Sequence, residues 1–233
     1  MRFDILSIFP ASLTSYFQAS ILKRAQEAGL ITIATHDVRA FATDKHQKVD
    51  DTPYGGGAGM VMMVEPFDRA LQSMVAVRGT PGTHIILLSA KGRPFDQVKA
   101  RELAQYDRLV LLAGRYEGVD ERVAEHLVDE ELSIGPFVLT GGELGAMVVV
   151  DAVARLLPGV LGNDESTVAE SFSEGVALEH PQYTKPEVYR DWTVPPVLLS
   201  GHHAEIEAWR NEQSLRQTNK RYDQEIPLGP VSK

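Results

Sequence analysis

The chain has 233 residues, 43% of them hydrophobic, which is enough for one large domain or for a main domain with a small partner. It contains no cysteine, so disulfides and thiolate metal sites are excluded. It also has no apolar run of about 18 residues and no secretory signal pattern at its N-terminus, so we expect a cytoplasmic protein without a membrane segment.

The net charge of −9 argues weakly against a polyanionic partner, but the charge is unevenly distributed. Residues 1–48 carry six Lys/Arg against four Asp/Glu, whereas residues 115–131 carry seven acids against two arginines. Residues 163–179 carry five acids and no base. The acidity is therefore concentrated, and local basic contacts with RNA phosphates remain open.

Periodicity and turn residues predict alternating strands and helices in the first part of the chain. In chain order the patterns indicate a strand at 2–9, a helix at 12–28, a strand at 30–38, an ordered loop through residue 59 and a helix after Pro66.

The middle of the chain contains three short apolar runs, at 84–88, 108–113 and 132–139. Such runs are typical of strands that are covered on both faces, as in a parallel sheet. Helices are predicted between them at 95–106 and after them at 144–157. The chain to about residue 160 is therefore expected to form an α/β domain with a mostly parallel sheet.

The remaining residues differ in composition. Residues 161–180 are polar and acidic and predict a flexible linker, while residues 181–233 predict a small second domain with a helix near 202–216. The expected organisation is a domain over 1–160, the linker, and a mainly helical C-terminal domain.

Glycine-bearing turns follow the three apolar runs, at Gly92, at 114–118 and at 141–145. Ligands of open α/β sheets bind beyond the carboxyl ends of the strands, but these glycines could also simply cap and turn the chain. The phosphate loop GxxxxGK[ST] is absent, and the GxGxxG fingerprint fails because Thr140 stands at its first position. A pyrophosphate ligand is therefore not indicated, whereas a nucleoside without phosphates is possible.

Other candidates have ordinary interpretations beside the functional ones. Residues 50–59 contain four glycines in five positions, which suits close approach to a flat base or a partner chain but also a hinge. Asp151 and Arg155 have the spacing of a surface ion pair, and Glu170 has the setting of a solvated linker glutamate. The pair His202-His203 is more typical of a helix start than of a metal site.

Read as a whole, the chain resembles the TrmD family of tRNA (guanine-N1)-methyltransferases. The resemblance is carried by VDDTPYGGGAGMVMMVEP at 49–66, GRYEGVDERV at 114–123, SIGPFVLTGGEL at 133–144, RLLPGVLG at 155–162 and PPVLLSGHHAEIEAWR at 195–210. These blocks occur in the family's order and at its spacing over nearly the whole chain.

The resemblance implies a SPOUT-type α/β fold whose mostly parallel sheet carries a deep trefoil knot, a rare exception to the usual topology rules. It also implies S-adenosylmethionine as methyl donor, a tRNA guanine beside the anticodon as acceptor, and magnesium in support of the reaction. Two subunits are expected to pair antiparallel and to share active sites, with the linker ordering over the target base and the C-terminal domain gripping the tRNA.

Residue roles are implied at matching positions. Glu170 takes the place of the catalytic base, Arg155 that of the arginine at the guanine carbonyl oxygen, and Glu117 that of a glutamate near donor and base. The donor positions correspond to Ser89, Gly114, Tyr116, Gly118, Ile134, Gly135, Pro136, Phe137, Val138, Leu139, Gly141 and Gly142. The base-binding positions correspond to Asp50, Gly55, Gly57 and Gly59.

The sequence departs from the family pattern at several of its positions. Glutamate replaces aspartate at 170, Pro136-Phe137 replaces an Asp-Tyr pair, Thr43 replaces a histidine, and Ala58 and Gly145 replace prolines. Two other functions compete with the methyltransferase: an NAD-dependent oxidoreductase, which the missing fingerprint disfavours, and an RNA-binding module without catalysis.

Overall fold

The computed structural model describes residues 1–162, 170–172 and 177–222. The chain divides into two units, Met1–Asp164 and Glu165–Lys233, and each is described by itself. Most of the predicted linker, at 163–169 and 173–176, and the end of the chain, at 223–233, lie outside the described residues. Within the described part, no helix has both the length and the apolar character that a membrane crossing requires.

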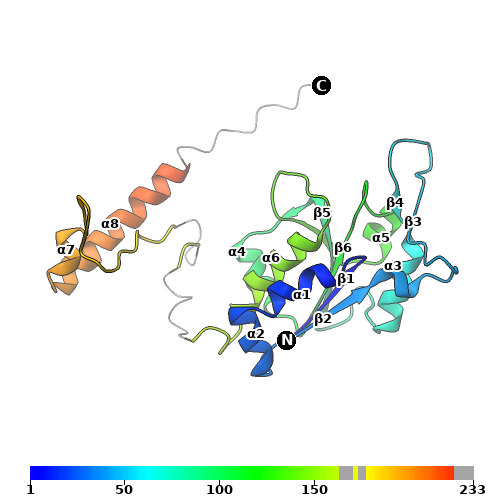
Figure 1. Ribbon diagram of the computed structural model, residues 1–233, viewed down its shortest axis with the longest axis horizontal. Coiled ribbons are helices and arrows are strands. Elements are labelled where there is room, and N and C mark those ends of the chain that lie inside the picture. The colour runs from blue at the N-terminus through cyan, green and yellow to red at the C-terminus, as the bar shows by residue number, and fades with distance from the viewer. Residues whose placement is uncertain (163–169, 173–176, 223–233) are drawn as a thin grey trace. The chain divides into compact units, whose positions relative to one another are not determined.

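The first unit is built on a five-stranded sheet in the order β2-β1-β6-β5-β7 (Figure 1). All four pairings in this sheet are parallel, which confirms the prediction of an α/β domain with a central parallel sheet. The strands are β1 (Arg2–Ser7), β2 (Thr32–Asp37), β5 (Thr83–Pro94), β6 (Arg108–Ala113) and β7 (Glu130–Ser133).

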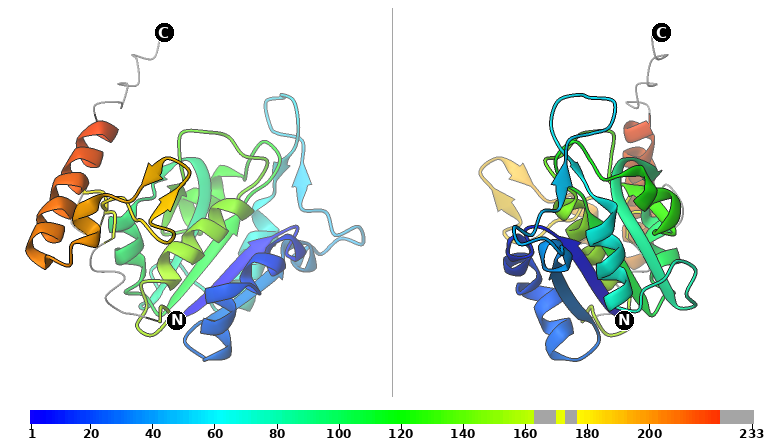
Figure 2. Two further views of the ribbon diagram at one scale, coloured as in Figure 1. Left: turned by 60° about the vertical axis from the view of Figure 1, so that its left-hand side comes forward. Right: turned by 90° about the vertical axis from the view of Figure 1, so that its right-hand side faces the viewer.

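Helices and short elements cover both faces of the sheet, so that its central strands are buried on two sides (Figures 1 and 2). Residues of α1 (Ala11–Phe17), α2 (Ser20–Glu27), α4 (Gln97–Leu103) and α6 (Glu143–Ala154) pack into one core cluster. Residues of η1 (Val38–Phe41), α3 (Val64–Ser73) and α5 (Glu121–His126) pack into the other.

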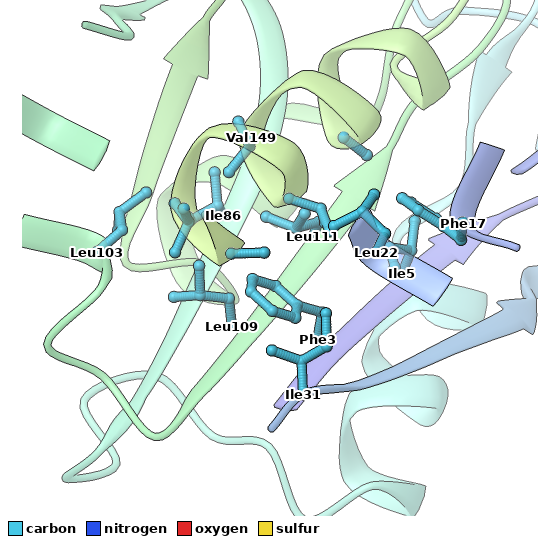
Figure 3. Packing of buried hydrophobic residues seen from close by; sticks show 14 of the residues in the cluster. Phe3, Ile5, Phe17, Leu22, Ile31, Ile86, Leu103, Leu109, Leu111 and Val149 are labelled. Carbon is cyan, nitrogen blue, oxygen red and sulfur yellow. The ribbon is translucent and has the colours of Figure 1, made fainter. Parts of the chain in front are cut away.

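Alternation along the strands divides the apolar runs between the two clusters. In β6, Leu109 and Leu111 face the α6 side, where Figure 3 shows them beside Ile86 and Val149. Val110 and Leu112 belong to the opposite cluster. Because successive side chains of a strand point to opposite faces, a continuous apolar run is what such a doubly covered strand requires.

Two predicted elements differ in the structure. The helix predicted over 12–28 is two helices, because Ala19 is extended and Ser20, the first residue of α2, has a φ of 45°, outside the right-handed helical region. The apolar run at 132–139 is not one strand. Its strand ends at Ser133, because Gly135 adopts a φ of 155° and Pro136 has no backbone N–H for a ladder.

β5 is longer than the predicted run at 84–88. Its pairing with β7 shifts register between Leu88 and Arg93, and Arg93 then pairs with Leu132. A Cβ on Gly92 would lie 2.6 Å from the backbone of Glu131 and Leu132, so the segment after Leu88 passes directly against β7. Two elements are not predicted by the sequence patterns: α5, and a short hairpin formed by β3 (Asp50–Asp51) and β4 (Val61–Met62).

Asp4 of β1 ties three neighbouring strands of the sheet together. Its buried carboxylate accepts hydrogen bonds from Arg2 and Arg108 and interacts with His36 Nε2 at 2.7 Å, so it joins β1, β2 and β6. Burial alone would raise the pKa of Asp4, but these bonds outweigh it and hold the pKa well below its usual range.

The second unit contains the hairpin β8 (Val188–Tyr189) and β9 (Trp192–Thr193), α7 (Pro196–Leu199) and α8 (His203–Tyr222). The helix predicted near 202–216 is thus present and extends six residues further among the described residues. The segment before the hairpin is tied to α8, because Ser214 Oγ donates to the Leu178 carbonyl and Thr218 Oγ1 accepts from the Leu178 amide.

Candidate active site

A cavity of about 540 Å³ opens at the carboxyl ends of β6 and β7, beside residues 87–91 in the middle of β5. Parallel strands bring their carboxyl ends to one edge of a sheet, so three segments distant in sequence meet there. The lining comes from residues 87–91, from residues 114–124 and from residues 131–145. Two of these segments contain the predicted glycine-bearing turns at 114–118 and 141–145, whereas Gly92, where the first turn is predicted, lies inside β5 and is not in the lining.

Most of the residues predicted to hold a ligand lie in the wall of this cavity. Glu117, one of the three predicted catalytic residues, is among them. Of the predicted donor positions, Pro136 is the exception and does not line the cavity. The other donor positions in the wall are Ser89, Gly114, Tyr116, Gly118, Ile134, Gly135, Phe137, Val138, Leu139, Gly141 and Gly142.

Gly142 allows two of the segments to touch through their backbones. Its amide donates to the Gly114 carbonyl at 2.9 Å, and a Cβ at this position would lie 2.8 Å from Ala113 Cα. Any side chain here would push the two loops apart, so the cavity wall requires glycine at 142.

A buried carboxylate fixes the same two loops to the sheet. Glu143, 3% exposed, accepts a hydrogen bond from Ser7 Oγ at 2.6 Å and bonds from Arg115 Nε at 2.9 and 3.1 Å. Ser7 ends β1, Arg115 follows β6 and Glu143 begins α6. A charged pair with both partners hydrogen-bonded is the arrangement that a low-dielectric interior tolerates.

Arg115 extends this network along the loop. Its guanidinium also donates to the Thr140 carbonyl at 3.3 Å, and it lies 4.9 Å from the centre of the Phe9 ring. A Cβ on Gly141 would lie 2.3 Å from Arg115 Nε. No sequence pattern predicts Ser7 or Arg115 as part of the site. For Glu143 a signal does exist, because an acid stands directly after two glycines and before an apolar helix.

The glycine loop of 50–59 reaches the cavity at one end. The Glu117 amide donates to the Met60 carbonyl at 3.0 Å, and a Cβ on Gly59 would lie 2.5 Å from the Glu117 side chain. Asp50 lies in β3, whereas Gly55 and Gly57 adopt φ values of 84° and 131° farther out in the loop. Of the predicted base-binding glycines, Gly59 is therefore the one packed against a cavity residue.

The charge on the cavity wall is mainly negative. The wall contains Glu117, Glu121 and Glu131 and the cations Lys91 and Arg115. Glu121 pairs with Lys91 and raises the pKa of that amine, while Arg115 is neutralised by Glu143. Glu131 Oε2 is buried and has no hydrogen-bond partner among the described residues, so the wall keeps an acceptor that a hydroxyl, an amino group or a cation would satisfy.

The other two predicted catalytic residues are Arg155 and Glu170. Arg155 is the C-cap residue of α6 and is not in the cavity lining. Asp151, its expected ion-pair partner, hydrogen-bonds to Tyr16, whose pKa is raised by burial and by this carboxylate. Glu170 belongs to the second unit. Within the ranges that the structure describes, no group of three or more His, Asp or Glu could hold a metal ion.

Comparison with known proteins gives a consistent match. A family model described as tRNA (Guanine-1)-methyltransferase TrmD matches residues 1–226. A protein of Dehalococcoides mccartyi is 54% identical over 221 residues, 95% of this chain and 88% of that protein. A protein of Chloroflexus aggregans is 57% identical over 218 residues, which are 94% of this chain and 84% of that protein. Both relatives are named tRNA (guanine-N(1)-)-methyltransferase.

The Glu143 network generates a prediction about stability. Replacing Glu143 with Ala leaves the buried Ser7 hydroxyl and the Arg115 guanidinium without their acceptor, so the free energy of unfolding should fall by about 3 kcal/mol. Urea denaturation measures this, and amide exchange at Gly142 should accelerate as its loop loosens. The control is Glu27→Ala, which removes an exposed glutamate paired with Lys23 at 3.7 Å. Equal effects of the two substitutions would show that the network does not hold the loops.

Proposed function

Because the chain belongs to the tRNA (guanine-1)-methyltransferase TrmD family, we propose that it transfers a methyl group from S-adenosylmethionine to N1 of a tRNA guanine. The guanine is the one immediately 3′ of the anticodon, at position 37. The observation that carries the proposal is the cavity wall, which is formed by the family-matching blocks at 114–123 and 133–144.

The residues of the wall suit this donor. Gly114, Gly141 and Gly142 are positions where a Cβ would collide with neighbouring atoms at 2.3–2.8 Å, so the loops present backbone rather than side chains. Glu131 Oε2 supplies a buried acceptor without a partner in the described chain, and the wall's surplus of carboxylates favours a cationic ligand. When bound, the sulfonium of the donor supplies an activated methyl group. The main task of these loops is to orient that methyl group toward the acceptor.

The guanine requires a proton acceptor and an anion stabiliser. Guanine N1 carries a proton at neutral pH and is a poor nucleophile, so a positioned carboxylate must accept that proton during attack. We assign this role to Glu170, with Glu117 as the glutamate that contacts donor and base. Negative charge then develops toward the carbonyl oxygen, where the guanidinium of Arg155 stabilises it.

Homodimerisation is part of the proposal, and α6 supports it. Helical spacing places Leu144, Val148 and Arg155 on one stripe, and Leu144 and Val148 are 54% and 45% exposed. A largely apolar helix that leaves such side chains exposed suits coverage by a second subunit. Arg155 would then lie at the edge of that interface, and Glu170 of one subunit would serve the cavity of the other.

We also propose that the sheet carries the family's trefoil knot. The segment after Leu88 passes against the backbone of β7, and the Gly142 amide bonds to the Gly114 carbonyl. Close contacts of this kind between the loops are compatible with a chain threaded at the cavity edge.

The remaining assignments follow the family. Residues 1–160 form the methyltransferase domain, residues 161–180 a flexible linker that orders over the base, and residues 181–233 a C-terminal tRNA-binding domain. We place the reaction in the cytoplasm, with magnesium in support. No residues are assigned to the magnesium ion, because the described residues offer no cluster that fits it.

Methyl transfer from labelled S-adenosylmethionine to an unmodified tRNA transcript tests the proposal. The purified protein should label wild-type tRNA and should not label a transcript with adenine at position 37. Calorimetry should detect the donor and not NADH, because the loops lack a pyrophosphate fingerprint. Binding of NADH without methyl transfer would identify an oxidoreductase, and tRNA binding without transfer would identify a non-catalytic module.

The assignment of Glu170 predicts a loss in the chemical step. Glu170→Gln keeps the size of the side chain but removes its basicity, so single-turnover methylation at saturating tRNA should slow by about 10²–10⁴-fold. Donor affinity should barely change, and Glu170→Asp should keep substantial activity. The matched control is Glu187→Gln, an exposed glutamate of the same unit. If Glu170→Gln reacts at the wild-type rate while Glu117→Gln is inactive, Glu117 is the base.

A further inference from the structure

The hairpin β8–β9 ends in a two-residue turn whose first residue is strained. Tyr189 pairs with Trp192, so Arg190 and Asp191 form the turn, and the hairpin is visible as two short yellow-orange arrows in Figure 2. Arg190 has a φ of 55°, a conformation that such turns usually give to glycine. A long cationic side chain therefore occupies a position where the backbone conformation favours glycine, which has no side chain.

Two aromatic rings stand beside this arginine on one face of the hairpin. Tyr189 and Trp192 lie directly across from each other, with ring centres 5.8 Å apart, and they are 53% and 66% exposed. The Arg190 guanidinium lies 5.4 Å from the centre of the Tyr189 ring and 5.8 Å from that of Trp192. Among residues 177–222 the described contacts of the Arg190 guanidinium are with these two rings, so its charge is available to a ligand.

Packing within the unit does not account for these residues. Trp209, the unit's other tryptophan, packs near His180 and Tyr183, which ties the preceding segment to α8. Tyr189 and Trp192 instead contact each other and Arg190, and leave more than half of their surface to solvent. Backbone strain that is maintained at an exposed aromatic and cationic cluster points to a role in binding.

We propose that this hairpin is a stacking platform for unpaired bases of the tRNA. The proposal rests on the proposed function, which makes tRNA the substrate. Tyr189 and Trp192 would stack on bases, and Arg190 would contact the adjoining phosphate, the combination of contacts that single-stranded RNA recognition uses. The hairpin would thereby contribute affinity for the substrate without taking part in methyl transfer.

The size and charge of the cluster favour RNA over a protein partner. Two aromatic side chains bury about 150–250 Å² each, whereas a stable protein interface buries about 800 Å² per partner. An uncompensated guanidinium at the centre of the patch suits a phosphate, and aromatic faces accept any base.

Binding of a fluorescent, unmodified tRNA transcript by the full-length protein tests the platform. Trp192→Ala and Tyr189→Ala should each weaken binding by about 5- to 150-fold, the range for loss of one stacked base. Trp192→Phe should restore most of the affinity, because it restores an aromatic face. Arg190→Gln should reduce the slope of affinity against salt concentration by about 0.7–0.9, the loss of one phosphate contact. The matched control is Leu215→Ala, an exposed apolar side chain of the same unit, which should bind as wild type.

Two further measurements, the single-turnover rate and sedimentation, distinguish a tRNA-binding platform from a catalytic role and from a protein interface. At saturating tRNA the single-turnover rate of Trp192→Ala should stay within about twofold of wild type, because stacking contributes to binding rather than to chemistry. Wild-type affinity in Trp192→Ala, or equal weakness in Trp192→Phe, would overturn the proposal. A change in sedimentation of Trp192→Ala would overturn it in favour of a protein interface. Failure of the proposed function would appear differently, as absence of methyl transfer by the wild-type protein.

Discussion

The buried carboxylate of Glu143 is the constraint on which the geometry of the cavity depends. It joins the end of β1, the loop after β6 and the start of α6 through Ser7 and Arg115. Removing any one partner would leave a buried polar group unsatisfied, so the three groups hold one another in place. Gly141 fits against Arg115 and Glu143, and Gly142 fits against the backbone of Ala113 and Gly114, only because both lack side chains. The wall of the proposed donor site thus depends on one ion pair and on two glycines, one packed against that pair and one against the end of β6.

Periodicity was sufficient to predict the sheet, because Ile85–Leu88 and Leu109–Leu112 are apolar on both faces, as a doubly covered parallel strand demands. It failed at 132–139, where apolar composition outweighed the Gly135-Pro136 break that ends the strand. The role of Glu143 in the site was not predicted either, because an acid at the start of a helix is ordinarily explained by its interaction with the helix dipole. Its partner Ser7 lies 136 residues away, a contact that no local pattern contains. The glycine turns were predicted as a group, but their convergence depends on strand order, which only the structure supplies.

The proposed reaction is divided between two surfaces. The cavity offers backbone, Glu117 and a buried acceptor on Glu131, which we propose bind and orient the donor. Arg155, proposed to stabilise the guanine carbonyl oxygen, is the C-cap of α6. Its helical spacing continues the stripe of the exposed Leu144 and Val148. Glu170 belongs to the other unit of the chain. A site in which these groups come together is therefore proposed to form between subunits, and the apolar stripe and the catalytic assignment support each other.

Complementation between differently inactivated subunits tests this claim most directly. Gly142→Val should disrupt the cavity wall of its own subunit, since a Cβ there would lie 2.8 Å from Ala113 Cα and push the two loops apart, and Glu170→Gln should remove the base. Each homodimer should be inactive, but a purified heterodimer should methylate tRNA at about half the wild-type rate, because one of its two symmetric sites is intact. An assembled heterodimer as inactive as its parents would show that Glu170 serves the cavity of its own chain, and a fully active monomer would contradict the shared site altogether.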